Sequence, residues 1–333
     1  MNRPDRPCLS HSGLEAARPT PAAKFRLCAG MKSPILPHMK IAAASLIGMI
    51  ALGTLSGQAR ADAIPAACMS VSAASRTMGS ASLAMTGYGA TLSGNSAHLT
   101  VGQVSVQDRQ GHLTLPNLRD ANALISFGLL KLVHNGNPAG CRGVDGRPAL
   151  KNLREALHQG AVAELVWHQI GLSEGDSRYT ADQITATLRS GQAPGSIDIV
   201  FSVNGLTSPG GSALPGSVRT TLTIPEQMLD DTKSPTGRIT ISSLQGIWAK
   251  GRLDGNGWVA PGHAANSSSG ELHLTITDLN DLLAVIRPVL PTGVSTALSV
   301  AQFMGHRDGN KVTWDLTLSN GILKVNSIPI PVN

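Results

Sequence analysis

The cysteines and histidines are the side chains in this sequence that could do chemistry, and their spacing indicates which chemistry. Of the four cysteines, Cys8 and Cys28 lie in a Pro- and Arg-rich N-terminal stretch. Cys68 and Cys141 lie where the hydrophobic patterns of a folded domain begin. In an oxidising compartment these two would form one disulfide. Closing a loop of about 70 residues would contribute on the order of 4 kcal/mol to the free energy of unfolding.

Lipidation of Cys68 is the alternative to a disulfide. The segment Pro65-Ala66-Ala67-Cys68 lacks the leucine that usually stands three residues before a lipidated cysteine. Arg60 and Asp62 also separate it from the nearest apolar run. The sequence therefore favours the disulfide.

The histidines do not form a recognisable metal site. Eight of them follow residue 62, and no two have the spacing of metal ligands, so we interpret them as scattered surface residues. They are His98, His112, His134, His158, His168, His263, His273 and His306. The motifs HExxH, CxxC, GxSxG and SxxK and the P-loop are also absent from residues 62–333. The sequence predicts no catalytic residue, no cofactor and no metal ion.

Three short matches to functional motifs are interpreted as turns or loops. Gly255-Asn-Gly257-Trp-Val-Ala260 fits a dinucleotide fingerprint, but Pro261 follows it and no helix begins there. Asp254 to Gly257 has the composition of a hairpin turn, and Ala265 stands where a calcium loop needs glutamate. His306-Arg307-Asp308 lacks the neighbours of a kinase catalytic loop, so we predict a loop there.

An export signal is predicted inside the chain. Met39-Lys40 is a positively charged start, residues 41–57 are an apolar run, and Ala59-Arg60-Ala61 is a cleavage pattern before Asp62. We interpret 1–38 as a disordered leader or a misassigned start, 39–61 as the signal peptide, and 62–333 as the mature protein. An uncleaved membrane anchor is the competing interpretation, although the run falls short of the roughly 20 apolar residues of a spanning helix.

The net charge excludes one class of partner. The whole chain carries a formal charge of +6, but eight Lys/Arg and only two acidic residues precede residue 62, so 19 of each remain in residues 62–333. A neutral surface gains little from releasing counterions and does not attract anionic lipid heads. We therefore expect no nucleic acid partner, and membrane contact only transiently or through the uncleaved anchor.

The size and composition favour a β-rich domain. Residues 62–333 suffice for a single α+β domain, or for two sub-domains at 62–206 and 218–333. Aromatic residues make up only 3% of the chain, which argues against a module that stacks sugars or bases.

A strand that runs into a helix start occurs three times. The copies begin at Leu113-Thr-Leu-Pro, Leu222-Thr-Ile-Pro and Leu274-Thr-Ile-Thr. In each copy, alternating apolar residues precede an Asn, Asp or Glu suited to the first turn of a helix. After the third copy the leucines recur at helical spacing, and Pro288 is predicted to end that helix.

The remaining periodicity predicts a fold of the α+β class, with a predominantly antiparallel, curved β-sheet and a few packed helices. Helices are predicted at 118–134 and 148–158. Strands are predicted at 161–172, 179–188, 196–203, 218–224, 238–244 and 247–253, and a hairpin at 312–325 turns at Asn320-Gly321. The segments 207–217 and 261–270 are predicted to be loops.

A group of large apolar residues in these strands could line a groove, with core packing as the alternative. The candidates are Phe201, Leu222, Trp248, Trp258, Leu274 and Trp314.

The C-terminal stretch resembles periplasmic domains of the AsmA-like and related envelope families. The residues that carry the resemblance are Ser269-Gly-Glu-Leu-His-Leu-Thr-Ile-Thr-Asp-Leu279 and Trp314-Asp-Leu-Thr-Leu-Ser-Asn-Gly-Ile-Leu-Lys-Val-Asn-Ser-Ile-Pro-Ile330. Ser327 stands where glycine is usual. The resemblance implies long antiparallel sheets with an apolar inner face and a role in envelope lipid handling, and it supplies no catalytic residue.

These observations lead to one main hypothesis. The protein is expected to be an exported, periplasmic, non-enzymatic envelope protein that binds lipid or another apolar ligand on a curved sheet, or that contacts an envelope protein partner. The alternative is a secreted or surface interaction module without a ligand cavity. A hydrolase ranks third because no catalytic set can be named.

Overall fold

The computed structural model describes residues 64–331 apart from 95–96, 135–137, 142–143, 145–146, 209–213, 231–236, 263–266 and 288–301. The predicted leader at 1–38 and the signal peptide at 39–61 lie outside the described residues.

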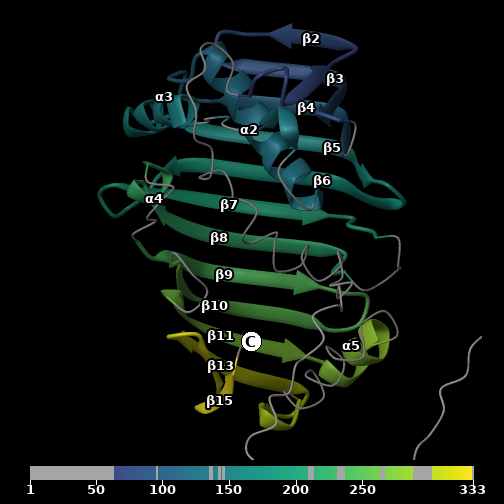
Figure 1. Cartoon of the computed structure of the whole chain (residues 1–333), viewed down its shortest axis with the longest axis vertical. Helices are drawn as coiled ribbons and strands as arrows, with labels where there is room; N and C mark the ends of the chain where they lie inside the picture. Colours follow the sequence, from purple (N-terminus) through teal and green to yellow (C-terminus); the bar gives the residue numbers. More distant parts are fainter. Residues whose placement is uncertain are drawn as a thin grey trace, which may run out of the picture. The chain divides into compact units, whose positions relative to one another are not determined.

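The described residues form one antiparallel sheet of 15 strands (Figure 1). The strands pair in the order β1-β3-β4-β5-β6-β7-β8-β9-β10-β11-β13-β14-β15, while β2 pairs with β3 and β12 pairs with β13. Their bounds are β1 Met69–Ser72, β2 Ser75–Met78, β3 Ser82–Leu92, β4 His98–Asp108, β5 Val162–Glu174, β6 Ser177–Ser190, β7 Ser196–Asn204, β8 Ser217–Pro225, β9 Ile239–Ile247, β10 Arg252–Ala260, β11 Ser269–Thr277, β12 His306–Asp308, β13 Lys311–Ser319, β14 Ile322–Val325 and β15 Ile328–Pro331. Each strand pairs mainly with its neighbours in the chain, and most connections are short; the longest are those from β4 to β5 and from β11 to β12.

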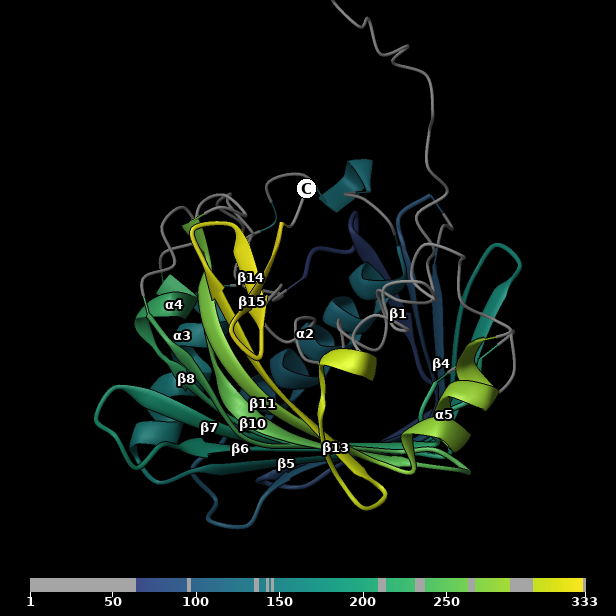
Figure 2. The ribbon, with the colours of Figure 1, turned by 90° about the horizontal axis from the view of Figure 1, so that it is seen from below.

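The helices are few and occupy particular places on the sheet. They are α2 Leu115–Val133, the 3₁₀ turn η2 Ala139–Cys141, α3 Arg147–His158, α4 Gln227–Asp230 and α5 Leu279–Ile286. The sheet is curved, and α2 lies on its concave side (Figure 2). We call this concave side the inner face. None of the helices in the described part of the chain is long and apolar enough to span a membrane.

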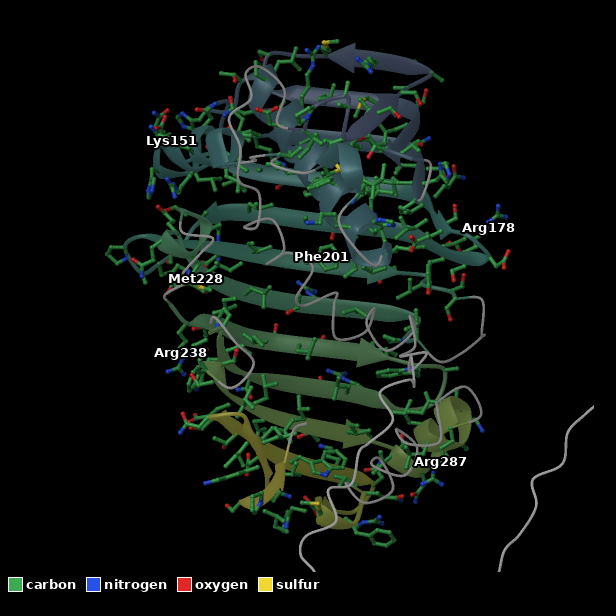
Figure 3. All side chains as sticks on the ribbon, viewed as in Figure 1. Lys151, Arg178, Phe201, Met228, Arg238 and Arg287 are labelled. Carbon is green, nitrogen blue, oxygen red and sulfur yellow. A yellow bond between two sulfur atoms is a disulfide. The ribbon has the colours of Figure 1, made fainter. Side chains whose placement is uncertain are left out.

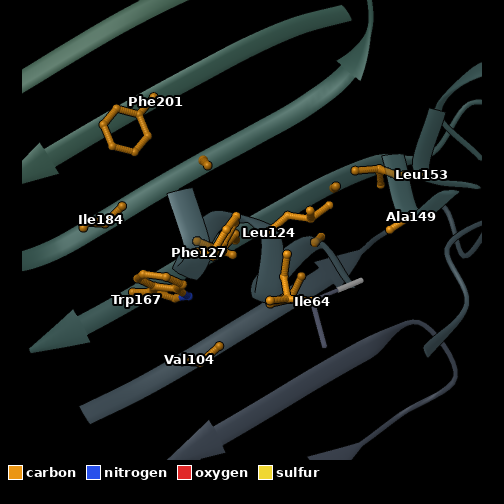
Figure 4. Packing of buried hydrophobic residues seen from close by; sticks show 14 of the residues in the cluster. Ile64, Val104, Leu124, Phe127, Ala149, Leu153, Trp167, Ile184 and Phe201 are labelled. Carbon is orange, nitrogen blue, oxygen red and sulfur yellow. The ribbon is translucent and has the colours of Figure 1, made fainter. Parts of the chain in front are cut away.

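The main core lies where α2 and α3 cover the inner face of β3 to β6. Trp167 on β5 is fully buried and packs with Phe127 and Leu124 of α2 (Figure 4). The indole Nε1 of Trp167 donates a hydrogen bond of 3.0 Å to Oδ1 of Asn122 on the same helix. The tryptophan therefore fixes α2 on the sheet by both apolar burial and a satisfied polar contact.

A disulfide joins Cys68 and Cys141, as the sequence predicted. Cys68 directly precedes β1, and Cys141 ends the turn η2 between α2 and α3. Both cysteines are buried. The bond therefore links the first strand of the sheet to the segment that connects the two covering helices.

A second, smaller core lies at the other end of the sheet. Leu279 and Leu283 of α5 pack against Val312 and Trp314 of β13, and Val325 of β14 completes the cluster. This α5 helix confirms the prediction for the third strand-to-helix copy. Pro288, which was predicted to end it, lies outside the described residues.

Most predicted elements are present with shifted bounds. The helices predicted at 118–134 and 148–158 are α2 and α3, and five of the predicted strands are β5 to β9. The predicted hairpin is formed by β13 and β14, with Asn320 and Gly321 at φ 52° and 73°, as a two-residue hairpin turn requires. The predominantly antiparallel sheet with a few packed helices is confirmed. The predicted loops at 207–217 and 261–270 lie partly outside the described residues.

Four predictions were wrong. Leu113 is not in a strand, because α2 begins at Leu115. The strand predicted at 247–253 contains the turn between β9 and β10, where the N–H of Trp248 donates to the carbonyl of Gly251. Asp254 to Gly257, predicted as a turn, lies within β10, and 306–308, predicted as a loop, forms β12. The turn-type composition of 254–257 did not show that Gly255 and Gly257 belong to a strand that is paired on both sides. Strands β1 to β4 lie outside the ranges predicted from sequence.

Candidate functional site

The register of the strands assigns each side chain to a face of the sheet, because directly opposite residues on paired strands share a face. A first row runs from Phe201 on β7 through Thr220, Leu244, Gly255 and Leu274 to Trp314 on β13. Phe201 belongs to the same core as α2, so this row lies on the inner face.

The neighbouring row is equally apolar. It consists of Ile199, Leu222, Ile241, Gly257, Leu272, Leu316 and Val325. A third row consists of Val203, Val218, Gly246, Leu253, Ile276 and Val312. The three rows contain no titratable side chain, and Thr220 is their only polar residue. Its hydroxyl donates to the carbonyl of Ser243 at 3.0 Å, so its hydrogen-bonding capacity is used within the sheet.

The opposite face of the same strands is polar. One of its rows is formed by Ser202, Arg219, Gln245, Asp254, Thr275 and Thr313. Such alternation is typical of an antiparallel sheet with one solvated face. In Figure 3, Arg178, Arg238 and Arg287 lie near the lateral margins of the sheet, whereas Phe201 lies over its middle. The charged groups thus surround the inner face without entering its rows.

Burial along the inner face is uneven. Phe201 and Leu222 are buried within the main core, and Trp314 is buried within the smaller core. Between them, Leu253 on β10 and Leu274 on β11 are only partly buried and belong to neither core. A side-chain carbon at Gly255 would lie 2.6 Å from Cδ2 of Leu274, so Leu274 extends across the glycine of the neighbouring strand. The inner face at β10 and β11 is therefore apolar but incompletely covered.

The six candidates from the sequence are not all on this face. Phe201, Leu274 and Trp314 share the first row, and Leu222 lies in the second. Trp258 lies on the outer face, with the guanidinium of Arg238 4.1 Å above its ring and its Nε1 donating to Glu271 at 3.0 Å. Trp248 lies in the turn after β9.

Sequence reasoning missed several inner-face residues, above all Leu272, Leu316 and Leu253. The signal that could have found them is the alternation of Leu272, Leu274 and Ile276, which puts all three on one face of β11. The candidates were chosen for large side chains and not by the alternation. Trp258 was therefore included, although its position in β10 places it on the outer face.

Comparison with known proteins assigns the chain to a family. Residues 72–332 match the family model described as "Uncharacterized protein conserved in bacteria (DUF2125)". The chain belongs to the DUF2125 family. No curated protein and no solved structure matches it.

The DUF2125 match extends from the last residue of β1 through β15, so it includes the smaller core and all of the main core except Ile64, Cys68 and Met69. Cys141 lies within the matched segment, whereas Cys68 lies four residues before it. The resemblance to AsmA-like domains is more specific than membership of the DUF2125 family, and it stays a prediction.

Proposed function

We propose that this DUF2125 protein is a non-enzymatic protein of the bacterial envelope that binds lipid acyl chains or another apolar ligand on the inner face at β10 and β11. The observation that carries the proposal is the incomplete cover of Leu253 and Leu274 between two filled cores. An apolar surface that is incompletely covered in this way marks an interaction site more often than a scattered surface leucine does.

The part of the face open to a ligand lies between the ends of the rows. Six strands lie between β7 and β13 along the pairing order, both included, so with about 4.8 Å between neighbouring strands the rows extend about 24 Å across the sheet. Phe201 and Trp314 at the two ends are buried in the cores, so a ligand can reach only the stretch at β10 and β11. That stretch carries no charge that would oppose part of an acyl chain.

Export to the envelope is part of the proposal. The Ala59-Arg60-Ala61 pattern supports it, and so does the disulfide, because disulfides persist mainly in oxidising compartments. An exported protein with a partly covered apolar face would meet lipid wherever membranes are assembled or maintained.

The test is native mass spectrometry of the unreduced protein purified from its own envelope fraction. We expect a mass that begins at Asp62, with the disulfide formed and with added mass that extracts as lipid. Leu274→Lys should abolish the retained mass, because an unpaired charge on the inner face is costly to bury under an acyl chain. Thr275→Lys is the matched control, since Thr275 is the next residue on the same strand and lies on the outer face.

Leu274→Ala serves where the lysine variant does not fold, and we expect it to weaken retention at least several-fold. A bare wild-type protein with no bound mass would contradict the proposal. It would favour the alternative of an interaction module that works through its polar outer face. Equal loss of lipid in Leu274→Lys and Thr275→Lys would contradict the placement of the ligand on the inner face.

A further inference from the structure

Four neighbouring strands carry one extra residue at the same level of the sheet. Along β3, β4, β5 and β6, one residue in each strand has no partner in the register. The residues on both sides of it pair in one continuous register. The skipped residues are Gly87, Gly102, Gln169 and Asp182. We call this row the crease. Because every strand has the extra residue, the inner face stays apolar on both sides of the crease.

The crease requires an unusual backbone conformation on alternate strands. Gly87 on β3 has φ +56°, Gln169 on β5 has φ +57°, and Gly205, just after β7, has φ +66°. Glycine adopts this left-handed region readily, whereas a residue with a side chain is strained there. The chain uses glycine at two of these positions and glutamine at the third. Glutamine, unlike asparagine and aspartate, is not enriched in this region, so its presence at φ +57° motivates a role for its side chain.

The side chain of Gln169 lines a polar depression on the outer face. The depression has a volume of about 290 Å³ and is lined by Gln103, His168, Gln169 and Asp182. Gln103 and His168 are directly opposite in the register, next to Val104 and Trp167 of the inner face. The depression therefore lies behind the main core, on the side away from α2.

The four lining side chains have no hydrogen-bond or ion-pair partner among the residues that the structure describes. Two glycines make space for them. The Gln169 amide lies where a side chain at Gly102 would be, and the Asp182 carboxylate lies where a side chain at Gly205 would be. Four polar groups on three adjacent strands thus face one volume without bonding to one another, and Gln103, Gln169 and Asp182 are exposed.

We propose that the polar depression at the crease binds a ligand rich in hydroxyl groups through Gln103, His168, Gln169 and Asp182. A carboxylate, two amides and an imidazole can accept from hydroxyl groups, and all but the carboxylate can also donate to them. The lining has no Lys or Arg, which an anionic ligand would require. One imidazole and one carboxylate are few for a metal ion, and no group of three His, Cys, Asp or Glu in the described part of the chain could hold one.

The hydroxyl groups could come from a glycan or from a small polyol such as a glycerol headgroup. The lining contains no Phe, Tyr or Trp ring on which a sugar could stack. We therefore expect binding by hydrogen bonds alone, with a Kd of about 1 mM. The site is independent of lipid binding because it lies on the opposite face of the sheet.

Gln169→Gly tests the site, because it should change two properties in opposite directions. Removing the strain should raise Tm by about 2 to 4 °C. Removing the amide should weaken ligand binding at least tenfold. Binding is followed in ¹H–¹⁵N spectra of the full chain, with an N-acetylglucosamine tetramer and glycerol as separate probes. Shifts confined to the crease support the proposal, and the tighter of the two probes identifies the source of the hydroxyl groups.

Asn320→Gly is the matched control. Asn320 also has a positive φ, of 52°, but it lies in the turn between β13 and β14. This variant should not change the binding of either probe. Unchanged binding in Gln169→Gly, a lower Tm in that variant, or no shift with either probe would overturn the proposal. Crease shifts with Zn²⁺ or spermidine in place of the hydroxyl probes would overturn the assignment of the ligand.

Discussion

The two halves of the inner face differ in cover and not in sequence pattern. On β3 to β6 the alternating apolar residues lie under α2 and α3 and form the main core. On β10 and β11 the same alternation continues, but Leu253 and Leu274 are only partly buried. The smaller core around α5 covers the face again at β13. One continuous pleated surface therefore provides a folding core at one end and an incompletely covered apolar surface in its middle.

The comparison shows that a strand pattern alone does not determine what an apolar face does. A helix that also makes hydrogen bonds to the sheet, as α2 does through Asn122, turns the face into a core of defined packing. At β10 and β11 no helix among the described residues covers the face in this way, and Leu253 and Leu274 are only partly buried. Substitutions in the covered half should therefore change mainly stability, and those in the middle should change mainly binding.

The largest effect is expected for Trp167→Ala. Trp167 is fully buried under α2, so its loss should cost about 4 kcal/mol of unfolding free energy and leave the Asn122 amide without its donor. Trp258→Ala is the matched control on the outer face and should cost about 1 kcal/mol, through the Arg238 and Glu271 contacts. Urea denaturation measures both. Equal costs would show that the two faces are not distinguished by burial.

Removing the disulfide should have an effect of similar size. The double variant Cys68→Ser/Cys141→Ser should lose about 4 kcal/mol, because 73 residues separate the two cysteines and the unfolded chain regains that freedom. Reducing the wild-type protein with dithiothreitol should produce the same midpoint in urea. A loss below about 1 kcal/mol would show that α2 and α3 hold the covered half without the cross-link.

An intermediate effect on stability is expected at Asp108, which ends β4 before the turn that leads to α2. Burial alone would raise the pKa of Asp108, but backbone N–H groups of Leu113, Val162, Gln110 and His112 donate to its carboxylate and lower the pKa below 3.8. The folded state therefore favours the charged form. The stabilisation is complete above the unfolded pKa and is lost as pH falls through the lowered one.

Asp108→Asn should accordingly cost about 2 kcal/mol at pH 7. It should also flatten the loss of stability between pH 4 and 2, as measured by urea denaturation at a series of pH values. Asp254, whose carboxylate pairs with the guanidinium of Arg252 on the outer face, is the control position, and Asp254→Asn should cost less than Asp108→Asn at pH 7. An unaltered profile in Asp108→Asn would show that the four backbone contacts do not stabilise the carboxylate.

Much of the fold was predictable because it depends on local rules. The spacing of apolar residues identified α2, α3 and α5, and Asn320-Gly321 identified the last hairpin. The interior of β10 was not predictable in the same way. Gly255 and Gly257 resemble a turn locally, and they belong to a strand only because β9 and β11 pair with it on both sides.

The candidate site was predictable only in part. Phe201, Leu222 and Leu274 follow from alternation within each strand, but the rows across the sheet depend on the register, which the sequence does not state. A bulge between Thr221 and Leu222 in the pairing of β8 and β9 shifts that register by one residue. The crease could not be found from sequence, because a single extra residue in each of four strands has no compositional signal.

The smallest effect on stability should come from Tyr88 on β3, which makes a polar contact with α2 within the main core. Its hydroxyl donates to Oγ of Ser126 at 2.9 Å, and the Ser126 hydroxyl in turn donates to the carbonyl of Asn122. Burial raises the pKa of Tyr88 above 10.0, although the hydrogen bonds partly oppose this. The folded state therefore favours the neutral phenol. Its contribution to stability is complete below pH 10 and is lost as pH rises through the raised pKa.

Tyr88→Phe should cost about 1 kcal/mol at pH 7 and reduce the loss of stability above pH 10. Burial also raises the pKa of Tyr179, so Tyr179→Phe and the double variant are measured beside it. If Tyr88→Phe alone leaves the alkaline loss unchanged, the Tyr88 contact is exposed to water in solution. In that case α2 covers the sheet less completely than its packing indicates, and the two halves of the inner face differ less than the structure implies.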